Sequence, residues 1–130
     1  MKLFDGLARF QPQMLGILRI ITALQFIEHG SQKLFNFPVS DHASALNSLT
    51  LTAGILEFAG GILLALGLFT RPVAFLLAGE MAIAYFTAHM PRDFFPANNG
   101  GDAAISFCFI FLYLVFAGAG AFALDNRRSA

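Results

Sequence analysis

The chain has 130 residues, of which 57% are hydrophobic and only 12% are charged. A soluble domain usually has about 25% charged residues, so this composition excludes an ordinary soluble protein and predicts one integral membrane domain over residues 1–130. The formal net charge is zero, which gives no basis for a nucleic-acid partner.

The first part of the chain predicts a surface segment followed by a helix. Residues 1–13 mix apolar and charged side chains, and their apolar residues fall near one helical face: Leu3, Phe4, Leu7 and Phe10. This pattern is typical of a short helix lying on the membrane surface. An apolar run then predicts a helix over 14–30, whose polar residues gather toward one side at helical spacing. We expect a loop over 31–46, where Pro38 and polar residues break the pattern.

Two long apolar runs follow and predict helices over 47–68 and 72–90, joined by a break at residues 70–72. A run of about 20 apolar residues is long enough to cross a membrane as a helix. Each run carries one carboxylate near its middle, Glu57 in the first and Glu80 in the second. A charged residue at that depth costs about 2.5–3.5 kcal/mol. We therefore expect both carboxylates to face protein, either protonated or paired.

The last apolar run predicts a helix over 102–124, after a loop at 91–99. The expected fold class is thus all-α, a bundle of four transmembrane helices with both termini on the same side. That side would carry five cationic residues: Lys2, Arg9, Arg71, Arg127 and Arg128. The other side would carry Lys33 and Arg92. Because cationic residues favour the cytoplasmic side, we predict cytoplasmic N and C termini and a multi-pass protein of the cell inner membrane.

Three ionisable residues fall inside the predicted spans. Arg19 lies near the start of the first helix, and its long side chain is expected to reach Glu57 or Glu80. Such a cluster would explain why all three are tolerated. One interpretation is structural, with an ion pair and a protonated glutamate that hold the helices in register. The other is a role in proton transfer or in chemistry linked to a quinone.

A second polar set is expected at the outer ends of the helices: Glu28, His29, Lys33, His89 and Asp102. One interpretation is that these residues lie at the membrane interface and contact water and lipid headgroups. Histidines and carboxylates can also bind a metal, and two histidines can ligate a haem, although the spacing matches no known ligand motif. A site for a quinone or for a partner protein is the third interpretation.

Several short motifs resemble the DoxX family of small membrane proteins. The matching segments, in chain order, are 29–34, 57–61, 67–72, 80–81 with His89, 99–102, and 118–120 with 124–125. The block from Glu57 to Pro72 is the most specific of these. The chain has Asp102 where the family pattern often has Glu, and Ala123 where Ser often precedes the Leu-Asp pair. The resemblance implies four transmembrane helices and a quinone-linked or thiol-stress redox setting, since the founding member is described as a subunit of a thiosulfate:quinone oxidoreductase.

We therefore predict a membrane subunit or accessory of such an oxidoreductase system. Glu57 and Glu80 would exchange protons, while Arg19, His29 and His89 would contact a quinone or a partner. The single cysteine, Cys108, excludes dithiol chemistry by this chain alone.

Other interpretations and partners follow from the same pattern. A non-catalytic scaffold that anchors a partner protein is the alternative function. A small transporter or lipid-binding protein fits less well, because the chain shows no inverted repeat. The expected partners are membrane lipid and either another protein or a second copy. A quinone is a better candidate cofactor than a haem or a metal.

Overall fold

The computed structural model describes residues 2–41 and 46–128, and the regular elements within these ranges are all helices. Four long helices form the body of the protein: α2 (Gln11–Phe35), α3 (Ser48–Leu66), α4 (Thr70–Ala84) and α6 (Asp102–Ala117). The shorter elements are α1 (Lys2–Asp5), a 3-10 helix (Gly6–Phe10), a π-helical turn (Tyr85–His89), α5 (Pro96–Asn99) and α7 (Asp125–Arg128). The predicted all-helical fold is confirmed.

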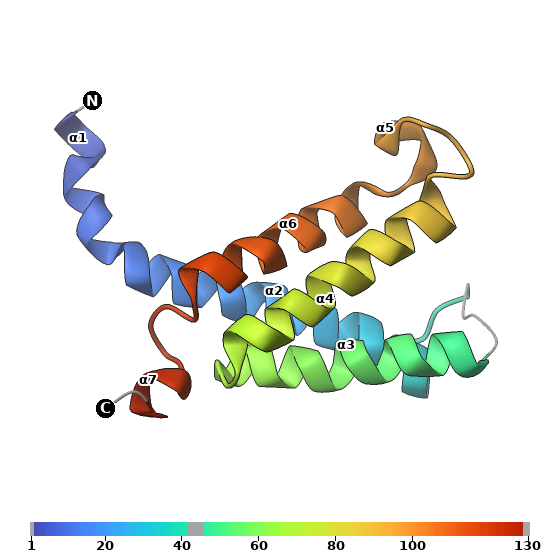
Figure 1. Ribbon diagram of the computed structural model, residues 1–130, viewed down its shortest axis with the longest axis horizontal. Helices are drawn as coiled ribbons and strands as arrows, with labels where there is room; N and C mark the ends of the chain where they lie inside the picture. Colours follow the sequence, from blue (N-terminus) through green and yellow to red (C-terminus); the bar gives the residue numbers. More distant parts are fainter. Residues whose placement is uncertain (1, 42–45, 129–130) are drawn as a thin grey trace.

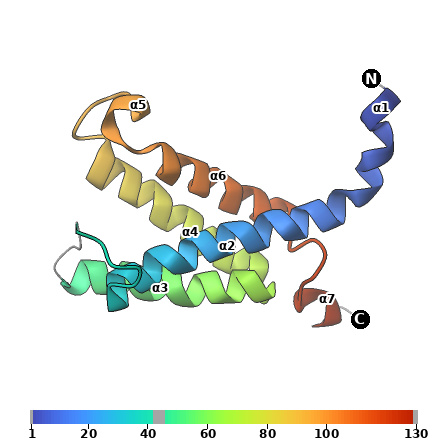
Figure 2. The ribbon, with the colours of Figure 1, turned by 180° about the vertical axis from the view of Figure 1, so that it is seen from behind.

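The long helices alternate in direction, so that the chain has two distinct ends. Helix α2 packs along α3, α4 packs along α6, and α3 joins the two pairs by packing against α4 (Figures 1 and 2). Both chain termini and the turn between α3 and α4 lie at one end, which we call the termini end (Figure 1). The segments that follow α2 and α4 lie at the opposite end, which we call the loop end (Figure 1).

Local signals explain where α3 begins and ends. The side chain of Asn47 accepts a hydrogen bond of 2.9 Å from the backbone N–H of Thr50, as a helix N-cap does. At the other end Gly67 adopts a left-handed conformation with φ of 66°. Leu68 then donates its N–H to the carbonyl of Leu63 at 2.9 Å. This closes the helix in the way that glycine favours.

Several helix boundaries differ from those that the sequence pattern predicted. Helix α2 continues to Phe35 rather than ending near residue 30, and it stops where Asn36 takes a left-handed conformation. Helix α6 ends at Ala117 rather than near residue 124, because the backbone of Gly118 turns to φ of 82°. The apolar character of residues 118–124 concealed this break.

Glycines allow α2 and α3 to cross with their backbones in near contact. A Cβ atom at Gly30 would lie 2.5 Å from the backbone nitrogen of Phe58. A Cβ at Gly61 would lie 2.7 Å from Cγ1 of Ile27. Small residues at helix crossings are typical of helix packing in membranes. Because α2 approaches the backbone of α3 at Phe58, it also lies close to Glu57, the preceding residue.

Gly30→Ala should therefore destabilise the protein by about 1–3 kcal/mol, the usual cost of overpacking, because the clash involves the fixed backbone of α3. Gly79→Ala is the matched control, since no atom lies within 4 Å of a Cβ built there. Unfolding of the two variants in detergent, followed by circular dichroism, would compare their stabilities. Equal midpoints for the two variants would contradict a tight crossing at Gly30.

The outward surface of the helices is strongly apolar. Large side chains such as Phe75, Phe86 and Phe116 are each more than 60% exposed. Among the described residues, two helical segments are long and apolar enough to cross a membrane, Ser48–Leu66 and Thr70–His89. Helix α6 is apolar but has only 16 residues. Large apolar faces of this kind are expected where a surface contacts lipid.

Candidate functional site

A buried ion pair joins α2 and α3 near the loop end. The Glu57 side chain is only 3% exposed, and Lys33 Nζ lies 2.7 Å from its Oε1 and 2.6 Å from its Oε2. Lys33 comes from the last turns of α2, beyond the crossing at Gly30. A carboxylate at this depth is costly unless it is paired. Lys33 therefore supplies the partner that the sequence pattern assigned to Arg19.

The predicted cluster of Arg19 with Glu57 and Glu80 was wrong. Arg19 is 0% exposed, but its guanidinium group points toward the termini end. Lys33 approaches Glu57 from the opposite end because α2 continues as a helix where a loop was predicted.

Backbone carbonyls surround the Arg19 guanidinium. Its Nε donates to Leu64 O at 2.8 Å, and its Nη2 donates to Phe122 O at 2.8 Å. Its Nη1 donates to Ala119 O and, at 3.1 Å, to Ala121 O. These bonds tie α2, the last turn of α3 and the segment after α6 together. They also satisfy carbonyls that a helix end or an irregular segment would otherwise leave without a donor.

Glu57 of α3 and Glu80 of α4 lie close together, as the sequence analysis expected. The Glu80 carboxyl of α4 is close enough to Glu57 for a hydrogen bond if one of the two is protonated. Both carboxyl oxygens of Glu80 are buried and have no hydrogen-bond partner among the described residues. Glu80 also lines an apolar groove of about 380 Å³ between α3 and α4, together with Leu56 and Ile83. Glu80 thus connects an apolar groove to the ion pair.

On the other side of the ion pair lies a cavity of about 290 Å³. Polar side chains from three helical segments line it: His29, Lys33, Glu57 and His89. Its apolar walls include Phe26 and Phe107. The sequence analysis had placed Glu57 in one polar set and the histidines in another. The structure brings Glu57 and the two histidines together at this one cavity.

A buried asparagine that the sequence analysis missed positions His89. His89 lies in the π-helical turn after α4, a distortion that is frequent at functional sites. Its Nδ1 lies 3.1 Å from the carbonyl oxygen of Asn99. Asn99 is 2% exposed and accepts a 2.8 Å hydrogen bond from the N–H of Gly101. Its amide also donates to the Tyr85 hydroxyl at 3.3 Å and to Asp93 O at 3.0 Å. The Asn-Gly-Gly motif at 99–101 was the available signal.

The other residues of the predicted outer set lie outside this cavity. Glu28 lines a separate cavity of about 460 Å³ with residues of α6, and His29 borders both cavities. Asp102 is exposed at the start of α6. Within residues 2–41 and 46–128, no three His, Cys, Asp or Glu side chains gather in a group that could hold a metal ion.

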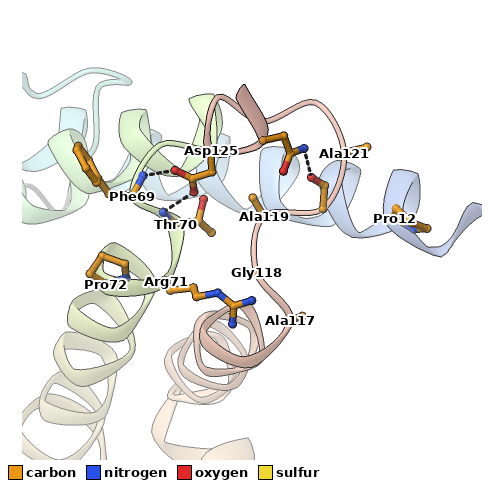
Figure 3. Close-up of a pocket in the computed structure, with 12 residues that line it drawn as sticks. Pro12, Phe69, Thr70, Arg71, Pro72, Ala117, Gly118, Ala119, Ala121 and Asp125 are labelled. Atoms are coloured by element: carbon orange, nitrogen blue, oxygen red, sulfur yellow. Dashed lines mark hydrogen bonds between the residues drawn. The ribbon is translucent and has the colours of Figure 1, made fainter. Parts of the chain in front are cut away.

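A second polar site, at the termini end, links the start of α4 with the end of α6 (Figure 3). The Asp125 carboxylate accepts hydrogen bonds from the N–H groups of Phe69 and Thr70, at 2.8 and 2.9 Å, and so caps the start of α4. Arg71 Nη1 donates to Val115 O at 2.6 Å and to Phe116 O at 2.8 Å, at the end of α6. These contacts give a structural reason for the motifs at 70–72 and 124–125.

The comparison with protein families agrees with this arrangement. The DoxX family model matches residues 14–90, which is more than half of the chain. The chain belongs to the DoxX family. The DoxX match spans Arg19, His29, Glu57, Glu80 and His89, so it includes all five predicted site residues. The family assignment, together with two helices that are long and apolar enough to cross a membrane, identifies a membrane protein.

Two relatives match along nearly their whole length. The chain is 46% identical over 129 residues to a protein of Haemophilus influenzae named only as "Uncharacterized protein", and the match covers 95% of this chain and 96% of the relative. It is 32% identical over 139 residues to "Inner membrane protein YphA" of Escherichia coli, and that match covers 98% of each. No solved structure matches the chain.

Proposed function

We propose that this DoxX protein is a multi-pass protein of the inner membrane that serves as a subunit or accessory of a quinone-linked or redox-stress oxidoreductase system. The name of the Escherichia coli relative supports the inner membrane as its location. All four long helices would span the bilayer, with the termini end in the cytoplasm. The excess of Lys and Arg that the sequence carries on that side supports this orientation.

The observation that carries the proposal is the buried carboxyl of Glu80, whose oxygens accept no hydrogen bond from an N–H or O–H group of the described residues. Its oxygens are buried next to Glu57, and the groove that Glu80 lines is apolar apart from Glu80 and Thr52. Ionisable groups at such a depth are typical of proton relays and ligand pathways. A largely apolar groove with few polar groups also suits a lipid-soluble ring that needs a hydrogen bond for its orientation.

A quinone in the groove would place a ring oxygen at Glu80. Reduction of a quinone to a quinol takes up two electrons and two protons. The electrons would come from a redox group of a partner protein, because the chain has a single cysteine and so no dithiol pair. Glu80 would donate a proton to the ring oxygen and regain one through Glu57. His29 and His89 line the cavity next to Glu57, where they can exchange protons with water at the loop end.

Native mass spectrometry of the gently purified protein, with lipids retained, tests this function. We expect the wild-type protein to carry a quinone, and Glu80→Leu to lower the affinity for it about tenfold, because leucine has no hydrogen-bond donor for the ring oxygen. Glu28→Leu is the matched control, because it makes the same chemical change at an exposed carboxylate. Cells that carry Glu57→Gln or Glu80→Gln should also tolerate redox stress less well. Folded variants with full quinone content and full tolerance would refute the proposal.

The alternative is a scaffold that anchors a partner protein without taking part in the chemistry. Exposed aromatic residues at the loop end favour it: Phe37, Phe94 and Phe95 are each more than 60% exposed on segments that connect the helices. The same mass spectrum separates the two functions. A co-purified protein without a quinone, lost in Phe94→Ser but retained in Glu80→Gln, would support the scaffold.

A further inference from the structure

A cavity of about 870 Å³ lies at the termini end (Figure 3). Its walls come from residues 69–72 at the start of α4, residues 117–121 after α6, and Asp125 and Asn126. It is separate from the cavity at Glu57, because α4 and α6 run between the two ends of the molecule.

Arg71 supplies the positive charge in this cavity. Only Nη1 of its guanidinium group is occupied, by the carbonyls of Val115 and Phe116. Nε and Nη2 have no acceptor among the residues that the structure describes. The guanidinium lies against Gly118, where a Cβ atom would come within 3.0 Å of Nη2. Glycine at that position keeps the space beside these free donors open.

The carboxylate in the cavity does not cancel this charge. Both oxygens of Asp125 accept hydrogen bonds from the N–H groups of Phe69 and Thr70 at the start of α4. The positive end of a helix dipole further offsets the negative charge there. Arg19 lies near enough to Asp125 to interact with it electrostatically. The hydrogen-bond donors that remain free in the cavity are therefore those of the positively charged Arg71 guanidinium group.

The surroundings of Arg71 are those of a membrane interface. Phe69, which lines the cavity, is 47% exposed, and Phe116, which precedes the lining residue Ala117, is 76% exposed. They lie at the ends of apolar helices, where acyl chains would meet headgroups. The chain also places Arg9 and Arg127, both exposed, at this same end. A ligand with an anionic head and apolar tails would satisfy both the guanidinium group and the exposed aromatic rings.

We propose that this cavity binds the phosphate group of an anionic phospholipid. The two free donors of Arg71 form the planar fork that pairs with two phosphate oxygens. The acyl chains would run along Phe69 and Phe116 into the bilayer. Through Arg71 the bound headgroup would stabilise the junction where α4 begins and α6 ends.

Lipid binding to the full chain in detergent, measured by native mass spectrometry, tests the proposal. We expect phosphatidylglycerol to bind at least about tenfold more tightly than zwitterionic phosphatidylcholine, since the choline cation of the latter neutralises the phosphate charge and would be repelled by Arg71. Inorganic phosphate, added as the third probe, should not displace phosphatidylglycerol at equal concentration. Equal binding of the two lipids, or displacement by inorganic phosphate, would overturn the assignment to an anionic lipid.

Two variants and one control locate the site. Arg71→Gln should abolish the preference for phosphatidylglycerol. Because this change also removes the cap on α6, Ala117→Glu is the second variant, which leaves Arg71 in place and adds an anion to the cavity wall. Arg127→Gln is the control, because Arg127 is exposed and lines a different cavity. An unchanged preference in folded Ala117→Glu, or a loss in the control as large as in Arg71→Gln, would overturn the proposal.

Discussion

Arg19→Met should lower the free energy of unfolding by at least about 3 kcal/mol, since it removes several hydrogen bonds to a charged group that are each worth about 1.5–3 kcal/mol. The guanidinium group is fully buried and donates to the carbonyls of Leu64, Ala119, Ala121 and Phe122. Methionine fills much of the same volume but offers no donor. The carbonyls after α6 would then lack a partner in an environment with little water.

Arg19→Met should destabilise the segment that follows α6 more than the rest of the protein. In the variant, trypsin should cleave after Arg127 faster than in the wild-type protein, because residues 118–128 lose their anchor. Unfolding by sodium dodecyl sulfate in mixed micelles would measure the overall effect. Arg9→Met is the matched control, because Arg9 is exposed and its Cζ lies over the ring of Phe10, 4.8 Å from the ring centroid. A surface change of this kind usually stays within about 0.5 kcal/mol. Superimposable unfolding curves for the two variants would show that the Arg19 contacts contribute little.

Arg19 also shows what the sequence pattern could not reveal. Its position within an apolar run indicated a buried cation, and the structure buries it completely. The expected partners were carboxylates, since these are the acceptors that a sequence displays. Backbone carbonyls do not appear in a sequence pattern at all. The acceptors also come from a segment near the opposite end of the chain, and helical periodicity within one run carries no information on such a contact.

The ion pair was missed for a related reason. Polar residues and Pro38 predicted a loop over 31–46, and this placed Lys33 outside the bundle. The segment remains helical to Phe35, and Gly30 lets it cross close to α3. Polar residues such as Ser31 and Gln32 can continue a helix where tertiary contacts favour it. By contrast, the inward orientation of Glu57 followed directly from the cost of placing a carboxylate in an apolar run, and its 3% exposure agrees with that argument.

Helix ends were the least predictable feature of the fold. In residues 118–124 the composition stays apolar, so the pattern extended α6 across them. The backbone of Gly118 breaks the helix at a positive φ, and Arg71 and Arg19 then bind the released carbonyls. A single glycine within an apolar run gives no clear sign of such a break, because glycine also occurs within membrane helices. The Gly118-Ala119-Gly120 motif of the family resemblance was the better signal.

Lys33→Met should destabilise the protein more than the double variant that combines Lys33→Met with Glu57→Gln. The single change leaves the Glu57 carboxylate buried without its partner, 3% exposed and beside a second carboxyl, Glu80. Breaking a fully buried pair costs about 3–5 kcal/mol, and we expect about 2–3 kcal/mol here because the Lys33 side chain is 34% exposed. Arg92→Met, an exposed cation at the same end, is the control and should stay close to the wild-type stability.

The double variant distinguishes the cost of an orphaned charge from the value of the pair itself. Removing both charges at once leaves no ion to desolvate, so we expect its unfolding free energy to lie within about 1 kcal/mol of the wild type. Unfolding in mixed micelles of the wild type, both single variants and the double variant gives the coupling energy directly. If the double variant lost as much stability as the sum of the single variants, the pair would not be coupled as its 2.6 Å contact requires. A stable double variant that no longer carries a quinone would instead show that the pair is kept for its chemistry, since the fold would tolerate its absence.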